Sequence, residues 1–190
     1  MRKLSLAIRK LTVPPVFAAA LLLILYVAYP EFYHTPWQLV GGLVFLCILP
    51  LSAYPLQRFI PHFKDRGREG QRSLAMIFSS VGYLFGVLLV LLTNASAELR
   101  LVFYEYLFCG ITMLVFNKVF KLRASGHACG ITGPVLLLLY FKLYIPALIG
   151  MAFIVSVYVS SLRAKQHTAP QLVGGSMIPI AVLCGILLMM

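Results

Sequence analysis

The chain has 190 residues, of which 61% are hydrophobic and 11% are charged. A soluble domain has about 45–50% apolar and about 25% charged residues, so this composition excludes an ordinary water-soluble fold. Because a membrane span takes about 20 apolar residues, about seven spans would use most of the chain, and no separate soluble domain fits beside them.

Apolar windows separated by prolines, charges and turn residues predict a series of helical spans. The first window follows a basic N-terminal stretch, as in a signal peptide, but it is long for that role and we expect it to remain as a span. The sequence therefore predicts an all-α fold, a polytopic membrane helix bundle of six or seven transmembrane helices, with residues 1–190 forming a single membrane domain. The predicted spans are residues 13–30, 36–55, 73–93, 98–116, 128–141, 145–161 and 172–190.

The basic residues are distributed unevenly over the predicted loops. The chain has 16 Lys and Arg against 5 Asp and Glu, a formal net charge of +11. Of these 16, 14 lie in the N-terminal stretch or in loops that alternate onto one side, and only Arg100 and Lys142 lie on the other. Because positive residues of short loops accumulate in the cytoplasm, we expect an integral, multi-pass membrane protein with a cytoplasmic N-terminus and, for seven spans, an external C-terminus.

The same charges predict contact with membrane lipids. In the loop between the second and third spans, Arg66, Arg68 and Arg72 are expected to contact anionic headgroups, and the alternative is that they bind a substrate phosphate. No nucleic-acid partner is expected, because no loop interleaves aromatic and basic residues on the scale of a binding surface.

Cysteines and carboxylates give no sign of a metal centre. Cys47, Cys109, Cys129 and Cys184 lie in apolar runs without a CxxC pair, which indicates packing rather than a disulfide framework or a zinc site. No metal or other cofactor is expected. Glu105 lies in an apolar run, about 16 Å from the cytoplasmic end of its span at about 1.5 Å per residue, and we expect it to serve packing or an outward polar pocket.

Two cytoplasmic segments contain most of the polar side chains that could perform chemistry. Residues 117–127 read NKVFKLRASGH and place cations, a hydroxyl and an imidazole just before a predicted helix, whose free N–H groups and dipole favour an anion. Residues 160–171 read SSLRAKQHTAPQ and follow a pair of spans that runs out and back. We therefore expect His127 and His167 to face each other across a polar pocket on one side of the membrane.

At these residues the sequence resembles the phosphatidic acid phosphatase type 2 superfamily of membrane lipid phosphatases. That family has a Lys/Arg motif at the end of one span, Pro-Ser-Gly-His opening the next, and then Ser-Arg, a later His and an Asp four residues beyond it. Residues 124–127, Ala-Ser-Gly-His, are similar to the second motif, and His167 followed by Gln171 and Gly175 is similar to the third. The resemblance covers a phosphatase-like motif region of about residues 114–180.

The resemblance implies a metal-independent lipid phosphate phosphohydrolase that acts through a phosphohistidine. It implies that His167 attacks phosphorus and that His127 protonates the leaving lipid alkoxide, while Gln171 orients His167. The substrate would be a lipid phosphate monoester or diphosphate, such as phosphatidate, phosphatidylglycerophosphate or a polyprenyl diphosphate. Its phosphate would be bound by the cations of Lys118, Lys121, Arg123, Arg163 and Lys165 and by the backbone amides of Ser125 and Gly126.

The sequence departs from the family pattern at several positions. Gln171 replaces the Asp that would stabilise a protonated ring, although its amide oxygen can still accept a hydrogen bond from the imidazole. Arg163 lies four residues before His167, whereas the family's Arg lies six before, at the position of Ser161. Ala124 replaces the proline of the second motif. The alternative is therefore a non-catalytic protein that binds or moves anionic lipid with the same cations. A small-solute transporter would need polar residues near mid-membrane, and apart from Glu105 these are scarce.

Overall fold

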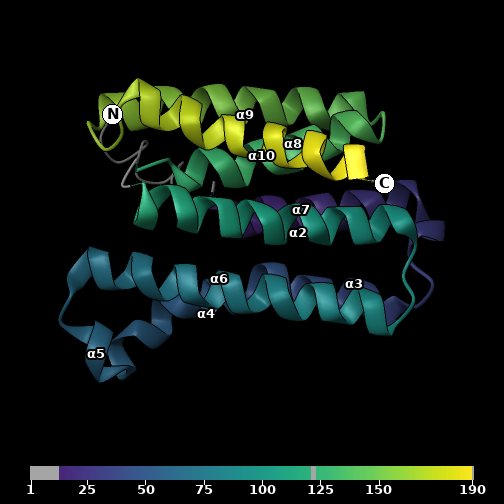
Figure 1. Ribbon diagram of the computed structural model, residues 1–190, viewed down its shortest axis with the longest axis horizontal. Helices are drawn as coiled ribbons and strands as arrows, with labels where there is room; N and C mark the ends of the chain where they lie inside the picture. The colour runs from purple at the N-terminus through teal and green to yellow at the C-terminus, as the bar shows by residue number, and fades with distance from the viewer. Residues whose placement is uncertain (1–12, 121–122, 190) are drawn as a thin grey trace. The chain divides into compact units, whose positions relative to one another are not determined.

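The computed structural model describes residues 13–120 and 123–189 of the chain. Every regular element within these ranges is a helix and none is a strand, which confirms the predicted all-α class (Figure 1). In chain order the elements are α2 (Pro14–Ala28), η1 (Pro30–Phe32), α3 (Pro36–Leu43), the π-helical η2 (Val44–Ile48), α4 (Leu49–Leu56), η3 (Gln57–Phe59), α5 (Pro61–Lys64), α6 (Gly67–Leu92), α7 (Ala97–Leu114), the π-helical η4 (Val115–Val119), α8 (Gly126–Tyr140), α9 (Tyr144–Arg163) and α10 (Ala169–Met189).

Among the described residues, five helices are long and apolar enough to cross a membrane. Two further apolar helices, α2 and α8, have 15 residues each. At about 1.5 Å per residue these measure about 22 Å, less than a hydrocarbon core of about 30 Å. Each of these seven apolar helices overlaps one of the seven predicted segments, and the chain is a multi-pass membrane protein. The five long spans are Pro36–Phe59, Glu69–Leu92, Ala97–Asn117, Tyr144–Arg163 and Ala169–Met189.

The chain divides into two compact units, which are described separately below. The N-terminal unit is Ala18–Leu107, and the C-terminal unit combines Met1–Phe17 with Phe108–Met190. The boundaries fall inside α2 and α7, so each of these two helices contributes to both units.

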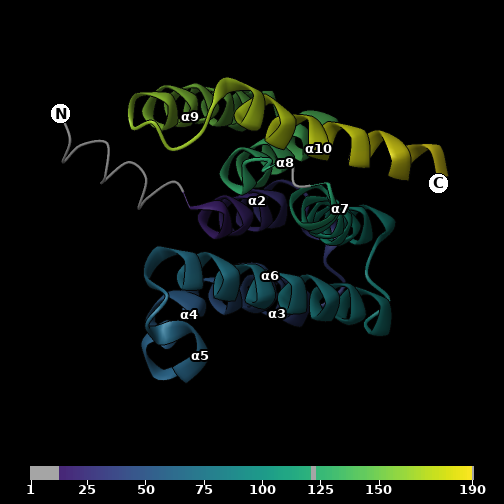
Figure 2. The same cartoon turned by 60° about the vertical axis from the view of Figure 1, so that its left-hand side comes forward.

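In the N-terminal unit, α6 packs against α4, η2 and α3 (Figure 2). The ring of Phe103 is completely buried, and two glycines leave the space that it fills. A Cβ at Gly42 would lie 3.1 Å from that ring and a Cβ at Gly86 would lie 2.6 Å from it. Close approach of helices through glycine is common in membrane proteins, and here it admits one large aromatic side chain into the core.

The long helix Pro36–Phe59 includes the π turn η2 because of a proline. Pro50 has no N–H group, so the carbonyl four residues earlier loses its usual partner. The amide of Leu49 instead bonds to the carbonyl of Val44, five residues back. A π turn of this kind absorbs the disruption without ending the helix.

A buried amide joins the two loops at one end of the N-terminal unit. The Oε1 atom of Gln38 accepts a hydrogen bond from the backbone N–H of His34 at 2.8 Å, and its Nε2 atom donates to the carbonyl and hydroxyl oxygens of Thr93 at 3.2 and 3.0 Å. The ring Nδ1–H of His34 donates to the carbonyl of Asn94 at 2.7 Å. These bonds fix the α2–α3 connection to the α6–α7 connection.

In the C-terminal unit, α8 is the interior helix and packs against both α9 and α10. Nine of its 15 residues are buried. Because neighbouring helices cover most of α8, it can be shorter than α9 and α10. Cys109 and Cys129 lie in a buried apolar cluster with Ala124 and Ile178, which confirms the packing interpretation for these two cysteines. Cys184, by contrast, is exposed on α10.

Candidate functional site

The start of α8 contains the first candidate histidine. Ser125 caps the helix, because its Oγ accepts a hydrogen bond from the N–H of Ala128 at 3.3 Å. Gly126 and His127 are therefore the first two helical residues, where backbone N–H groups have no partner within the helix. His127 is partly buried, and its imidazole lies at the helix end that favours an anion.

The second candidate histidine directly precedes the cap of α10. The helix begins at Ala169, and the backbone N–H of Thr168 donates to Oε1 of Gln171 at 3.2 Å. A side chain in the first turn that reaches back to the cap amide in this way is half of a capping box. The Nδ1 atom of His167 lies 3.2 Å from the same oxygen, so one amide both caps the helix and holds the ring.

The two contacts on Gln171 determine which nitrogen of His167 bears the proton. The N–H of Thr168 can only donate, so the side-chain atom that it faces is the amide oxygen. An amide oxygen can only accept, so Nδ1 of His167 is the donor. In the neutral ring the lone pair then lies on Nε2, and an imidazole that acts as a nucleophile through Nε2 needs this tautomer.

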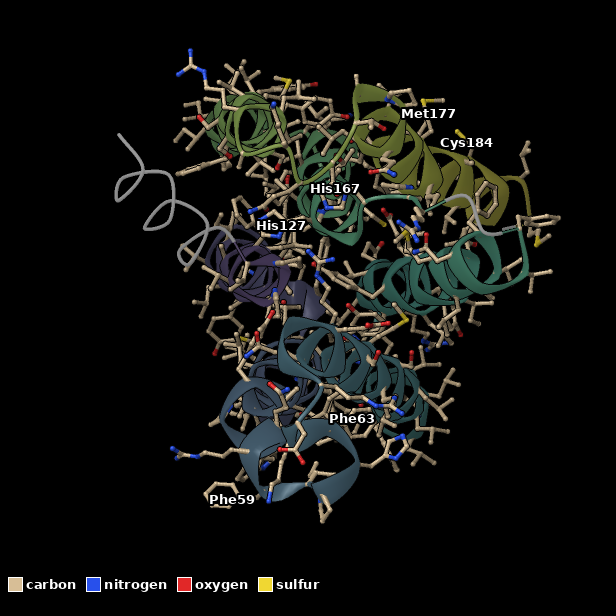
Figure 3. The ribbon with its side chains drawn as sticks, turned by 90° about the vertical axis from the view of Figure 1, so that its left-hand side faces the viewer. Phe59, Phe63, His127, His167, Met177 and Cys184 are labelled. Atoms are coloured by element: carbon tan, nitrogen blue, oxygen red, sulfur yellow. The ribbon has the colours of Figure 1, made fainter. Side chains whose placement is uncertain are left out.

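The two helix starts are joined directly through their backbones. The N–H of Ser125 donates to the carbonyl of Gln171 at 2.9 Å. One turn further along α10, Gly175 packs flat against Ser125, and a Cβ there would overlap the Ser125 carbonyl oxygen and lie 3.1 Å from its carbonyl carbon and nitrogen. The segments of His127 and His167, about 40 residues apart in sequence, thus meet where α8 and α10 begin (Figure 3).

A pocket of about 360 Å³ opens beside His167. Lys165 lies at its rim in the left-handed region, with φ of 50°. The N–H of Lys165 bonds to the carbonyl of Leu162 at 3.0 Å and the N–H of Gln166 bonds to that of Ser161 at 3.1 Å. These are the two bonds of a Schellman motif, so the C-terminus of α9 fixes the backbone from which the Lys165 side chain extends. The pocket is lined by Leu162, Lys165, Gln166, His167, Thr168 and Gln171.

The other predicted phosphate-binding cations differ in how far the structure describes them. Arg123 is exposed, with φ of 42°, just before the α8 cap. Arg163 is exposed in the last turn of α9, whereas Ser161 is buried, so Arg163 is the side chain on this turn that a phosphate could reach. Lys121 lies outside the described residues, and so does the side chain of Lys118.

Ser125 departs from the role expected for it. Its N–H is bonded to Gln171, its Oγ accepts from Ala128, and the residue is completely buried. In this arrangement neither group is available to a phosphate. The Ser125 cap does not use the amide of Gly126, an exposed residue in the first turn of α8, where a helix start favours an anion. Ser125 positions the start of α8 against α10.

Four further residues considered from the sequence belong to the N-terminal unit. Arg66 and Arg72 are exposed, the side chain of Arg68 lies outside the described part of the chain, and Glu105 is buried within α7.

Sequence reasoning missed a cluster of hydroxyl groups in the C-terminal unit. The Oγ atom of Ser176 lies 2.9 Å from Oγ1 of Thr132 and 2.8 Å from the hydroxyl oxygen of Tyr158. Helices α8, α9 and α10 each contribute one group, and such bonds link helices in an apolar environment. The signal in the sequence was three hydroxyl residues in apolar spans, but their wide separation gives no local spacing to recognise.

Within the described ranges, no three His, Cys, Asp or Glu side chains gather in a group that could hold a metal ion.

Comparison with known proteins gives no relative: no protein-family model matches the chain, and no curated protein or solved structure is significantly similar to it.

Proposed function

We propose that this protein is a membrane lipid phosphatase that hydrolyses a lipid phosphate monoester or diphosphate through a phosphohistidine on His167. The observation that supports this most is the continuous set of bonds from one histidine segment to the other. Gln171 holds the His167 ring through its side chain and the residues before His127 through its backbone carbonyl. The motif spacing in the sequence does not by itself imply that one residue bonds to both histidine segments.

In the proposed reaction, the Nε2 lone pair of His167 attacks phosphorus, forming a P–N bond as the P–O bond to the lipid breaks. His127, in its protonated form, gives a proton to the departing alkoxide. Water then attacks the phosphohistidine, His127 takes one proton from that water, and the P–N bond breaks to release inorganic phosphate. Splitting the displacement into two steps is the advantage of a covalent intermediate.

The charge of the transferred phosphoryl group would be stabilised by Lys165, Arg163 and Arg123. Their exposure leaves them able to reach a substrate at the membrane surface, and Lys165 already lines the pocket beside His167. Cations and helix-start N–H groups that are in place before the reaction stabilise charge that develops in the transition state.

We further propose that this site opens to the cytoplasm, with the N-terminus on the same side, because of the uneven distribution of Lys and Arg over the loops. The test is labelling of cysteines placed in the loop of His167 by a membrane-impermeant maleimide, in a background from which the exposed Cys184 has been removed. Labelling only after the cytoplasmic side is opened supports this orientation, whereas labelling of intact cells from outside contradicts it.

The neutral side chain of Gln171 favours one alternative, a protein that binds anionic lipid without turnover. Phosphate release from phosphatidate, phosphatidylglycerophosphate and polyprenyl diphosphate by detergent-purified protein distinguishes the two. We expect release from at least one of these substrates, its abolition in His167→Ala and His127→Ala, and no change in His62→Ala, an exposed histidine of α5. Retained binding of anionic lipid with no release from any substrate would support the alternative.

A further inference from the structure

The connection between the spans Pro36–Phe59 and Glu69–Leu92 folds into a defined turn, here called the interfacial turn, residues 57–66. A buried amide holds its base: Nε2 of Gln57 donates to the carbonyl of Phe63 at 3.0 Å and to that of Gly67 at 2.7 Å. Gly70 packs against the carbonyl of Phe63, where a Cβ would lie 2.6 Å away. The turn is therefore held against the start of α6.

The outer surface of the interfacial turn combines an aromatic ring with positive charge. Phe59 is 67% exposed and points away from the helices in Figure 3. The guanidinium carbon of Arg58 lies 4.8 Å from the centre of its ring. The turn also has three exposed basic side chains against one carboxylate, that of Asp65. The basic residues are Arg58, Lys64 and Arg66.

We propose that the interfacial turn is a binding surface for anionic lipid, with Phe59 inserted at the boundary between headgroups and acyl chains and the basic side chains paired with lipid phosphates. Three observations favour lipid over a protein partner. The exposed ring lies at the last residue of a span, the net charge around it is positive, and the cation beside it is stacked on the ring. Aromatic rings at span ends favour the interface, and clustered basic residues attract anionic leaflets.

This proposal concerns the N-terminal unit alone and does not depend on catalysis. Its test uses the single tryptophan of the chain, Trp37, which is 72% exposed at the start of α3. Phe59 is 22 residues further along the same helical run, or about 33 Å at about 1.5 Å per residue. Trp37→Phe combined with Phe59→Trp therefore moves the reporter to the interfacial turn, and the native chain provides the matched control at the other end.

Each protein is reconstituted in vesicles, and its fluorescence is quenched with brominated phosphatidylglycerol or brominated phosphatidylcholine. At low salt we expect the relocated tryptophan of the double variant to favour the anionic lipid by about threefold or more and this preference to weaken in about 1 M salt. Trp37 of the native chain should show a ratio near one. Adding Arg58→Gln and Arg66→Gln to the double variant should bring its ratio close to that of the native chain.

Two outcomes would overturn the proposal. Equal quenching of the relocated tryptophan by the two lipids would mean that the turn contacts lipid without recognising charge. Absence of quenching by either lipid would mean that protein covers the ring, as expected if the turn binds an acidic protein partner. Unchanged thermal unfolding of each variant serves as the check that the comparison concerns folded protein.

Discussion

The contact between Gly175 and Ser125 allows a prediction in which the chain provides its own control. Gly175→Ala adds a methyl group that overlaps the Ser125 carbonyl oxygen and comes within 3.1 Å of two other backbone atoms of that residue. Backbone atoms cannot rotate away as a side chain can, so α10 and the start of α8 must separate. Gly174→Ala, one residue earlier on the same helix, meets nothing within 4 Å.

The two substitutions should change the free energy of unfolding in opposite directions. Overpacking typically costs about 1–3 kcal/mol, and separation also strains the bond from the N–H of Ser125 to the carbonyl of Gln171. Replacing an interior helical glycine by alanine without a clash gains about 0.5–1 kcal/mol. Both variants gain this amount, so it cancels between them, and we expect Gly175→Ala to be less stable than Gly174→Ala by the overpacking cost of about 1–3 kcal/mol.

The assay is equilibrium unfolding in mixed micelles of a mild detergent and dodecyl sulfate, followed by far-ultraviolet circular dichroism. Phosphate release is measured on the same samples, because a shift of about 1 Å at a catalytic group can lower the rate by about a hundredfold. Equal stability of the two variants would refute the reasoning, since it would mean that the start of α8 does not rest on Gly175.

Three further predictions follow from particular side chains. Gln171→Glu keeps the shape of the side chain and both contacts of its oxygen but adds a charge, so it should raise turnover by about ten- to a hundredfold; lower turnover would mean that the amide itself is needed. Lys165→Gly and Lys142→Gly each remove the backbone strain of a lysine in the left-handed region, so both should stabilise the protein by about 1 kcal/mol. Only Lys165→Gly should raise KM for the lipid phosphate. Burial raises the pKa of the Tyr33 phenol above its ordinary range, so the unfolded chain loses this proton first and stability should fall as pH rises above about 10. In Tyr33→Phe the slope of the unfolding free energy against pH should be smaller by one proton. At neutral pH this variant should also be less stable by about 1 kcal/mol, because it loses the bond from the Tyr33 hydroxyl to the Leu22 carbonyl.

The helices could be predicted from the sequence because membrane spans are set by continuous apolar length. The predicted helix geometry was wrong where charged residues or a missing backbone hydrogen bond, and not hydropathy, determine it. The third span was expected to start at residue 73, whereas α6 starts at Gly67, because its first turns are charged and lie outside the hydrophobic window. The π turn before Pro50 follows from one missing hydrogen-bond donor, which hydropathy does not report.

The candidate site could be predicted only in its local part. The family resemblance implied that the oxygen of Gln171 can accept a bond from the His167 ring, and the two atoms lie at hydrogen-bond distance. The capping role of the same oxygen and the bond from Ser125 to the Gln171 carbonyl were not predicted. The first requires the helix boundary at Ala169, and the second joins residues 46 positions apart, for which a single sequence contains no signal.

The most direct test of the proposed function is a search for the covalent intermediate. Purified protein is mixed with a lipid phosphate carrying labelled phosphorus, the reaction is stopped in alkali, in which phosphohistidine survives, and the labelled peptide is identified. We expect label on His167 that disappears with time as inorganic phosphate is released, and no label in His167→Ala. Phosphate release without label on His167, or neither label nor release while anionic lipid still binds, would contradict the proposal.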